Sequence, residues 1–91
     1  MMTNNALKVN NSDNVAVVTQ RIVKGSAVIV NEVQVCSATE DIALGHKVAL
    51  VAIPAKGKVI RYGEVIVEAT CPIACGEWVH VHNTQPFPGA R

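Results

Sequence analysis

The chain has 91 residues, with eight basic and seven acidic side chains and a formal net charge of +1 at neutral pH. This balance, with no run of Lys or Arg, excludes the basic footprint of a protein that binds nucleic acid or an anionic membrane surface. No apolar stretch reaches the roughly 18 residues of a membrane span, and the polar start lacks the pattern of a signal peptide, so we expect one cytoplasmic domain whose three cysteines remain free thiols.

The predicted elements are short strands in an all-β fold. Val and Ile together number 23 against three Leu, and β-branched side chains fit a pleated surface better than a helix. Between the second and third strands, Asn31 and Glu32 predict a tight hairpin turn. In chain order, the strands are expected at residues 15–19, 27–30, 33–36, 47–52, 65–69 and 78–82.

A seven-residue pattern recurs along the chain and predicts turns between these strands. An Ile anchors in the core, a Gly takes a backbone conformation that other residues resist, and a Val opens the next strand. The pattern occurs at 22–28, 42–48 and 73–79, and at 53–59 with one extra residue before its glycine. We expect a compact domain over residues 13–83, with a frayed tail at 1–12 and a Pro-rich tail at 84–91.

Two cations beside turn glycines are candidates for binding a carboxylate. Lys47 follows Gly45-His46, and Arg61 precedes Tyr62-Gly63. An Arg binds a carboxylate through its planar fork, a Lys binds it as a point charge, and the Tyr62 hydroxyl adds a donor. The alternative is that both cations are ordinary surface residues and that Tyr62 is a core ring with its hydroxyl at the rim.

Histidines near the C-terminus are candidates for holding a metal. His80 and His82 are two apart, so on a strand they would project from one face. Two imidazoles on one face can hold a metal if a third ligand approaches, and His46 is the candidate for that ligand. The alternative is a solvated pair of histidines on an exposed face.

Four segments together resemble the SAF domain of the altronate and galactarate dehydratase family. They are residues 13–17, 41–50, 59–64 and 76–83, which include the Gly-His-Lys and Tyr-Gly elements. The resemblance implies a β-clip fold that accompanies a much larger catalytic domain. In that family, the two together eliminate water from a hydroxy acid, or sulfite in the sulfo-lyase branch, with a divalent metal such as iron or manganese. Where Arg61 stands, the family usually has Lys, a change that keeps the cation.

The expected function follows from this resemblance. The chain looks like the small subunit, or an N-terminal-type domain, of a metal-dependent carbon–oxygen or carbon–sulfur lyase for a sugar acid or related hydroxy acid. It would be paired with a large catalytic subunit and inactive alone. The alternative is a non-catalytic module that binds a carboxylate or a protein partner, and association of identical copies stays open. By the resemblance, the substrate side is lined by His46, Lys47, Arg61, Tyr62 and Gly63, with His80 and His82 nearby as metal candidates.

Overall fold

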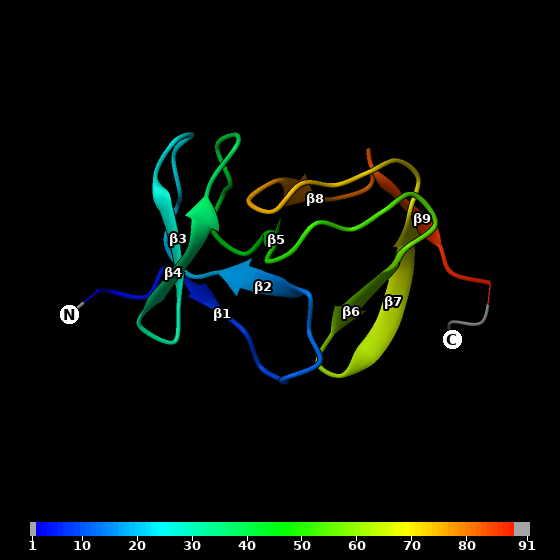
Figure 1. Cartoon of the computed structure of the whole chain (residues 1–91), viewed down its shortest axis with the longest axis horizontal. Coiled ribbons are helices and arrows are strands. Elements are labelled where there is room, and N and C mark those ends of the chain that lie inside the picture. Colours follow the sequence, from blue (N-terminus) through cyan, green and yellow to red (C-terminus); the bar gives the residue numbers. More distant parts are fainter. Residues whose placement is uncertain (1, 89–91) are drawn as a thin grey trace.

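Figure 1 shows the computed structural model of the protein, in which residues 2–88 are described. These residues form strands and no helix, so the all-β prediction is confirmed, and none of them lies in a helix that could cross a membrane. The strands are β1 (Ala6–Leu7), β2 (Val15–Val18), β3 (Ala27–Val30), β4 (Val33–Ser37), β5 (Lys47–Ala49), β6 (Lys58–Arg61), β7 (Glu64–Ala69), β8 (Trp78–Val79) and β9 (Thr84–Pro86).

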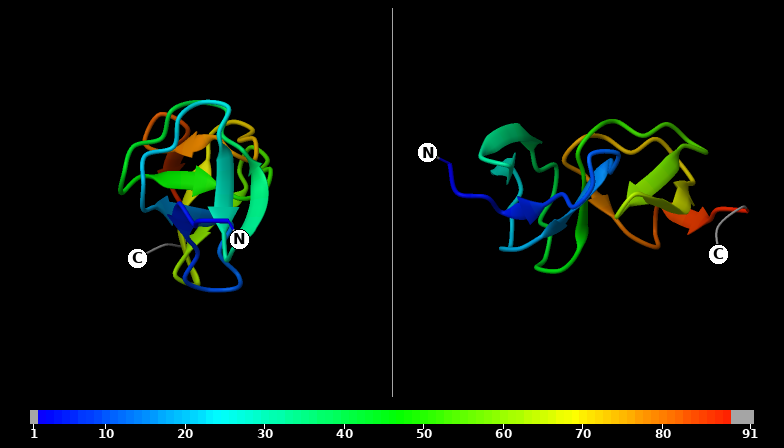
Figure 2. Two further views of the ribbon diagram at one scale, coloured as in Figure 1. Left: turned by 90° about the vertical axis from the view of Figure 1, so that its left-hand side faces the viewer. Right: turned by 90° about the horizontal axis from the view of Figure 1, so that it is seen from below.

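The strands make three small antiparallel sheets along an elongated body of 40 × 23 × 19 Å. Their orders are β1-β2-β5-β8, β3-β4 and β6-β7-β9. In Figure 1 the β3–β4 hairpin stands at one end, the four-stranded sheet lies in the middle, and β6, β7 and β9 form the other end. The view from below in Figure 2 keeps this order along the long axis.

The two ends are copies of one arrangement, displaced by 31 residues along the chain. The pair Ala27↔Ser37 of the first hairpin corresponds to Lys58↔Glu68 of the second, and every other register pair of the two hairpins matches in the same way. Both hairpins also shift register at the same place, after Val28 and after Val59. The sequence analysis found the short turn pattern but not this longer repeat.

Each copy has its own hydrophobic core, anchored by a pair of isoleucines. Ile22 and Ile42 bridge each other in the first copy, and Ile53 and Ile73 do so in the second. All four are buried, in two separate clusters of Val, Ile and Ala. Because each side chain of this size stabilises by about 1.5–3 kcal/mol when fully buried, the four anchors make a major contribution to a domain this small.

The recurring turn forms as predicted in three of its four copies. Gly25, Gly45 and Gly76 adopt φ of 88°, 86° and 89°, a left-handed conformation that a side chain disfavours. In the fourth copy, Lys56 takes this position with φ 68°, and Gly57 does not. The Ile-to-Val distance is the same in all four copies, so the extra residue expected in the fourth is wrong.

Both segments expected to be tails contribute a strand. Within residues 1–12, β1 pairs with β2, and Ala6 of β1 is buried in the first core cluster. Within residues 84–91, β9 pairs with β7. Just before β1, the Asn5 side chain bridges the irregular point of the first hairpin by donating to Ala27 O and accepting from Ile29 N. These segments have few apolar residues, so their strands depend on long-range pairing that no local pattern reveals.

The predicted turn at Asn31-Glu32 is confirmed, because both residues have positive φ, 53° and 63°, as a type I′ hairpin turn requires. The predicted strand at residues 78–82 is shorter than expected and ends at Val79. The predicted strand at 47–52 likewise ends early, at Ala49.

Candidate functional site

A hydrogen bond between an indole and an imidazole lies at the centre of the candidate site. His46 precedes β5 and Trp78 opens β8, and the two strands pair through Lys47↔Val79 and Val48↔Trp78. Trp78 Nε1–H donates to His46 Nδ1 at 3.1 Å, and the two rings meet edge to face with centroids 5.4 Å apart. Sequence analysis predicted a role for His46 but not for Trp78.

His80 and His82 both lie against the ring of Trp78. The His80 ring stacks on it with centroids 5.0 Å apart and planes 12° apart, while His82 is tilted at 4.8 Å. The two histidines do not lie on a strand, so the strand expected there is wrong, although both rings lie against Trp78. They belong to a turn closed by the buried Asn83, which accepts from His80 N and donates to Trp78 O.

Lys47 lies next to this aromatic cluster. It sits in β5 between β2 and β8, and its side chain is half-buried. Burial lowers the pKa of Lys47, and the positive charge of Arg61 lowers it further. Partial burial also lowers the pKa of His80, with further contributions from the charges of His46, Lys47 and His82. Lys47 therefore lies within electrostatic reach of Arg61 on one side and of the His80 imidazole on the other.

Arg61 ends β6, and its guanidinium lies over the ring of Tyr62, with Cζ 4.9 Å from the ring centroid. Its Nε is buried and donates to no acceptor among residues 2–88. The ion pairs within that part of the chain are Arg21–Asp41 and Lys56–Glu68, so neither Lys47 nor Arg61 has a carboxylate partner there. Two neighbouring cations without a counter-ion create a positive potential that favours an anion.

Asp13 holds the hairpin tip that carries Tyr62 and Gly63. Tyr62 has φ 56° and Gly63 has φ 77°, the type I′ turn that corresponds to residues 31–32 of the first hairpin. The buried carboxylate of Asp13 accepts from Gly63 N at 2.8 Å and from Asn10 N at 3.1 Å. Burial alone would raise the pKa of Asp13, but the backbone N–H bonds from Gly63 and Asn10 outweigh it and leave the pKa lowered.

The described residues do not form a complete site for a divalent metal. Among residues 2–88, no group of three or more His, Cys, Asp or Glu side chains is placed to hold a metal ion. His46 and His80 are near each other, with ring centroids 5.1 Å apart, but Nδ1 of His46 is occupied by the indole of Trp78. A metal bound through His80 and His82 would need ligands from outside these residues.

The three cysteines are free thiols, and Cys36 lies against Cys75. Burial, together with a hydrogen bond to the thiol of Cys75, raises the pKa of Cys36 to about 12. Cys75 in turn donates to Leu50 O at 3.1 Å. At neutral pH Cys36 is therefore an unreactive thiol that fills space, as expected for a small apolar side chain.

Three residues of the site were missed by sequence reasoning: Trp78, Asp13 and Asn83. Trp78 is the only tryptophan of the chain, which was a usable signal. The Asp13 carboxylate accepts a hydrogen bond from Gly63, 50 residues later in the chain, and the Asn83 amide accepts one from His80 N and so closes a turn. Neither residue therefore has a local sequence signature. Of the predicted residues, Tyr62 contacts Arg61 and Gly63 is held by Asp13, and neither has a described contact with the histidines.

Comparison with known proteins gives a family match and similar chains. A family profile described as the altronate/galactarate dehydratase SAF domain matches residues 4–86. The chain is 40% identical over 79 residues to altronate dehydratase of Escherichia coli (strain K12) and 35% identical over 79 residues to altronate dehydratase of Bacillus subtilis (strain 168). It is 42% identical over 74 residues to galactarate dehydratase (L-threo-forming) of Escherichia coli (strain K12).

These similarities cover most of this chain and a small part of each relative. The two altronate dehydratase matches span 87% of the chain and 16% of the relative. The galactarate dehydratase match spans 80% of the chain and 14% of the relative. Most of each dehydratase therefore has no counterpart in these 91 residues.

Proposed function

Because the chain belongs to the altronate/galactarate dehydratase SAF domain family, we propose that it supplies substrate-binding groups to a larger catalytic polypeptide that acts on sugar acids. The family match confirms the resemblance read from the sequence, and the fold is the all-β, β-clip-like arrangement that this family implies. The proposed reaction is the elimination of water from a hydroxy acid, with carbon–sulfur elimination as the related chemistry of the same family.

The observation that carries this proposal is the uncompensated pair Lys47 and Arg61. Burial and the charge of Arg61 lower the pKa of Lys47, and the buried Nε of Arg61 lacks an acceptor among residues 2–88. A buried donor without a partner costs about 1–3 kcal/mol. A sugar-acid carboxylate would supply the opposite charge that both cations lack, and its oxygens are acceptors for the guanidinium and ammonium N–H groups.

The imidazoles and the tyrosine suit the remainder of such a substrate. A sugar acid carries several hydroxyl groups, and the free nitrogens of His46 and His80 can donate to or accept from them. Tyr62 is exposed at the hairpin tip, with Arg61 stacked on its ring. The proposed role of this chain is to bind and orient the substrate.

The catalytic centre is proposed to lie in the larger polypeptide. Elimination next to a carboxylate needs a base for the α-proton and help for the departing hydroxyl, which a divalent metal supplies in this family. No step through a metal is assigned to this chain, because its described residues contain no group that fits one. A small chain that matches 16% of a dehydratase supports the same division of labour.

Reconstitution tests this proposal. The full chain is combined with the dehydratase-type polypeptide of the same organism, and lyase activity is measured on a panel of sugar acids. We expect Lys47→Ala and Arg61→Ala each to lower kcat/KM at least tenfold, mainly through KM. Lys24→Ala is the matched control, since Lys24 is an exposed lysine in another copy of the same turn pattern. Equal activity for all three variants would contradict the proposal, and sugar-acid binding without any effect on lyase activity would favour a free-standing binding module.

A further inference from the structure

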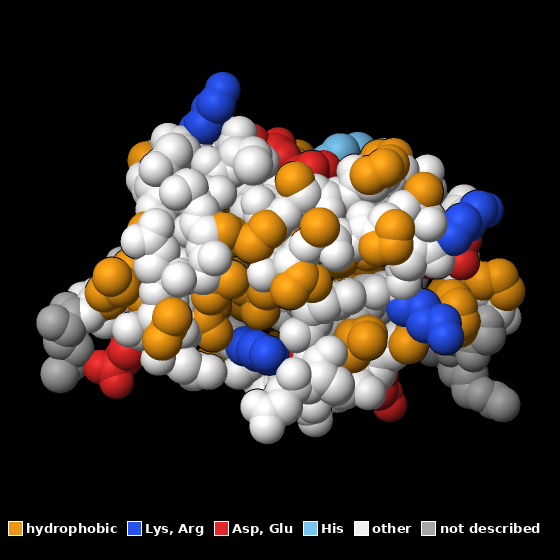
Figure 3. Space-filling model, in the orientation of Figure 1, with side chains coloured by type: hydrophobic (Ala, Val, Ile, Leu, Met, Phe, Trp, Pro, Cys, Tyr) orange, Lys and Arg blue, Asp and Glu red, His pale blue; other side chains and the backbone are white. Residues whose placement is uncertain are grey.

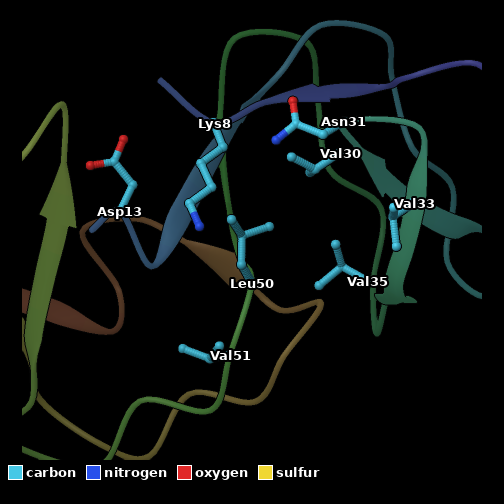
Figure 4. Close-up of a pocket in the computed structure, with 8 residues that line it drawn as sticks. All are labelled: Lys8, Asp13, Val30, Asn31, Val33, Val35, Leu50 and Val51. Atoms are coloured by element: carbon cyan, nitrogen blue, oxygen red, sulfur yellow. The ribbon is translucent and has the colours of Figure 1, made fainter. Parts of the chain in front are cut away.

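An open pocket of about 360 Å³ lies beside the first hairpin, and none of the rings of the aromatic cluster lines it. Figure 4 shows Val33 and Val35 extending from β4 toward Leu50 and Val51 of the segment that begins at the end of β5. Lys8, Asp13 and Asn31 supply its polar side chains. We name its apolar part the apolar groove, which consists of Val30, Val33, Val35, Leu50 and Val51.

The apolar groove is open to solvent and lies at a sheet edge. Val33 is 61% exposed and Val51 is 51% exposed. Among the described strands, β4 pairs with β3 alone, so its second edge carries unpaired backbone groups. Figure 3 shows hydrophobic side chains gathered in a band across this face of the molecule. An exposed apolar surface beside an unpaired edge is typical of a surface that another polypeptide covers.

The repeat of the fold shows that these positions need not be apolar. With the displacement of 31 residues, Val30, Val33 and Val51 correspond to Arg61, Glu64 and His82 of the second copy. The second copy therefore has charged or polar side chains at these three places, whereas the counterparts of Val35 and Leu50 are apolar. Val30 and Leu50 belong to the first core cluster. Folding does not, however, require the exposed Val33 and Val51 to be apolar, because the fold accepts Glu and His at their counterparts.

The apolar groove is also joined to the candidate substrate site. Asp13 is part of the pocket wall, and its carboxylate accepts the N–H of Gly63 at the tip of the second hairpin. That tip carries Tyr62, whose ring lies under the guanidinium of Arg61. A polypeptide seated in the apolar groove would therefore be a neighbour of the residues proposed to bind substrate.

We propose that the apolar groove is the docking surface for the dehydratase-type catalytic polypeptide, which inserts an apolar segment there. This inference rests on the proposed function. It commits to that occupant because the similar dehydratases contain far more chain than the 16% matched here, and that remainder must contact this domain to use its substrate groups. The position of Asp13, between the apolar groove and the hairpin tip, places this contact beside the substrate site.

Co-purification from the native host tests the proposal. The tagged full chain is compared with Val33→Asp and Val51→Asp, and the recovered polypeptides are identified by peptide sequence. Leu44→Asp is the matched control, because Leu44 is 66% exposed and is not part of the pocket wall. Thermal unfolding checks that each variant folds, as expected for surface substitutions. We expect the wild type and Leu44→Asp to recover a dehydratase-type polypeptide, and both groove variants to recover at least tenfold less.

This experiment distinguishes a failure of the proposed docking surface from a failure of the proposed function. Full recovery by Val33→Asp and Val51→Asp would overturn the docking surface and leave the proposed function standing. Absence of any dehydratase-type polypeptide with the wild-type chain would overturn both. A wild-type chain that dimerises through the groove, with the two variants monomeric and still bound to the catalytic polypeptide, would assign the groove to a second copy and overturn the proposed occupant.

Discussion

The indole Nε1–H of Trp78 donates to Nδ1 of His46 at 3.1 Å, which fixes how His46 can take part in binding. An indole N–H is a donor only, so Nδ1 of His46 must be unprotonated. The proton of the neutral ring is then on Nε2, which can donate to a ligand oxygen. Trp78 is therefore a positioning residue: it acts on a ligand through His46.

Replacing Trp78 by Phe should free Nδ1 of His46 from its hydrogen bond. The Trp78→Phe variant keeps an aromatic ring and loses the donor, so Nδ1 of His46 can carry the proton. We expect the folded structure to persist with a loss of about 0.5–1.5 kcal/mol, the usual net value of one hydrogen bond. Nitrogen chemical shifts of the labelled His46 ring report the hydrogen bond to Nδ1, and an Nδ1 shift that is the same in the wild type and the variant would contradict the assigned bond.

The protonation of His80, which stacks on Trp78, should be detectable as the pH changes. The pKa of His80 is lowered, so the folded protein binds that proton more weakly than the unfolded chain. The resulting stability is fully present above the ordinary histidine pKa of about 6.5, and it decreases as the pH falls below that value. We expect His80 to titrate below 6.5 by proton NMR, and the fluorescence of the single tryptophan to follow the same midpoint. A midpoint above 6.5 would contradict the effect of burial and of the Lys47 charge on this ring.

Two glycines of the repeated turn allow the cost of backbone strain to be measured separately from the cost of a steric overlap. Gly25 and Gly76 have φ of 88° and 89°, but a Cβ at Gly25 meets open space, whereas at Gly76 it would overlap the carbonyl oxygen of Ser37. We expect Gly25→Ala to cost about 1–2 kcal/mol, the penalty of a left-handed alanine. Gly76→Ala should cost roughly 4 kcal/mol or leave the chain unfolded. Urea denaturation measures both, and equal losses would contradict the close approach at Gly76.

Asp13 should contribute acid-dependent stability. Its pKa is lowered in the folded protein because backbone N–H groups bind the carboxylate, so this stability is present above the unfolded value near 3.8. It is lost as the pH falls through the lower, folded pKa. Asp13→Asn should reduce stability by about 1–3 kcal/mol at neutral pH and flatten the loss on acidification. If wild type and Asp13→Asn lost stability in parallel between pH 5 and pH 2, each followed by thermal unfolding, the role given to Asp13 would be wrong.

Local chemistry made much of the fold predictable. The Asn31-Glu32 turn and the left-handed glycines of the repeat depend on a few adjacent residues, so the sequence displays them directly. Lys56 is the exception, because a lysine in a left-handed conformation carries no signal of its own. The strands β1 and β9 were missed because their residues are mostly polar and are held by pairing with distant strands.

The candidate site was predictable as a set of residue types and not as a geometry. Lys47, Arg61 and the histidines stood out because they interrupt apolar segments next to turns. The arrangement of His80 and His82 was wrong because Asn83 closes a turn where alternation suggested a strand. The contact of Asp13 with Gly63 joins residues 50 apart, and only the folded chain brings them together.

The central claim is that Lys47 and Arg61 form a cationic site that lacks its anion. The most direct measurement is the pKa of Lys47 by carbon NMR of its labelled Cε, with and without a sugar acid, in the assembled complex. The account predicts a value below the ordinary one of about 10.4 without ligand, and a rise on binding as the carboxylate compensates the charge of Arg61. A Lys47 pKa at or above the ordinary value that does not respond to any sugar acid would contradict it.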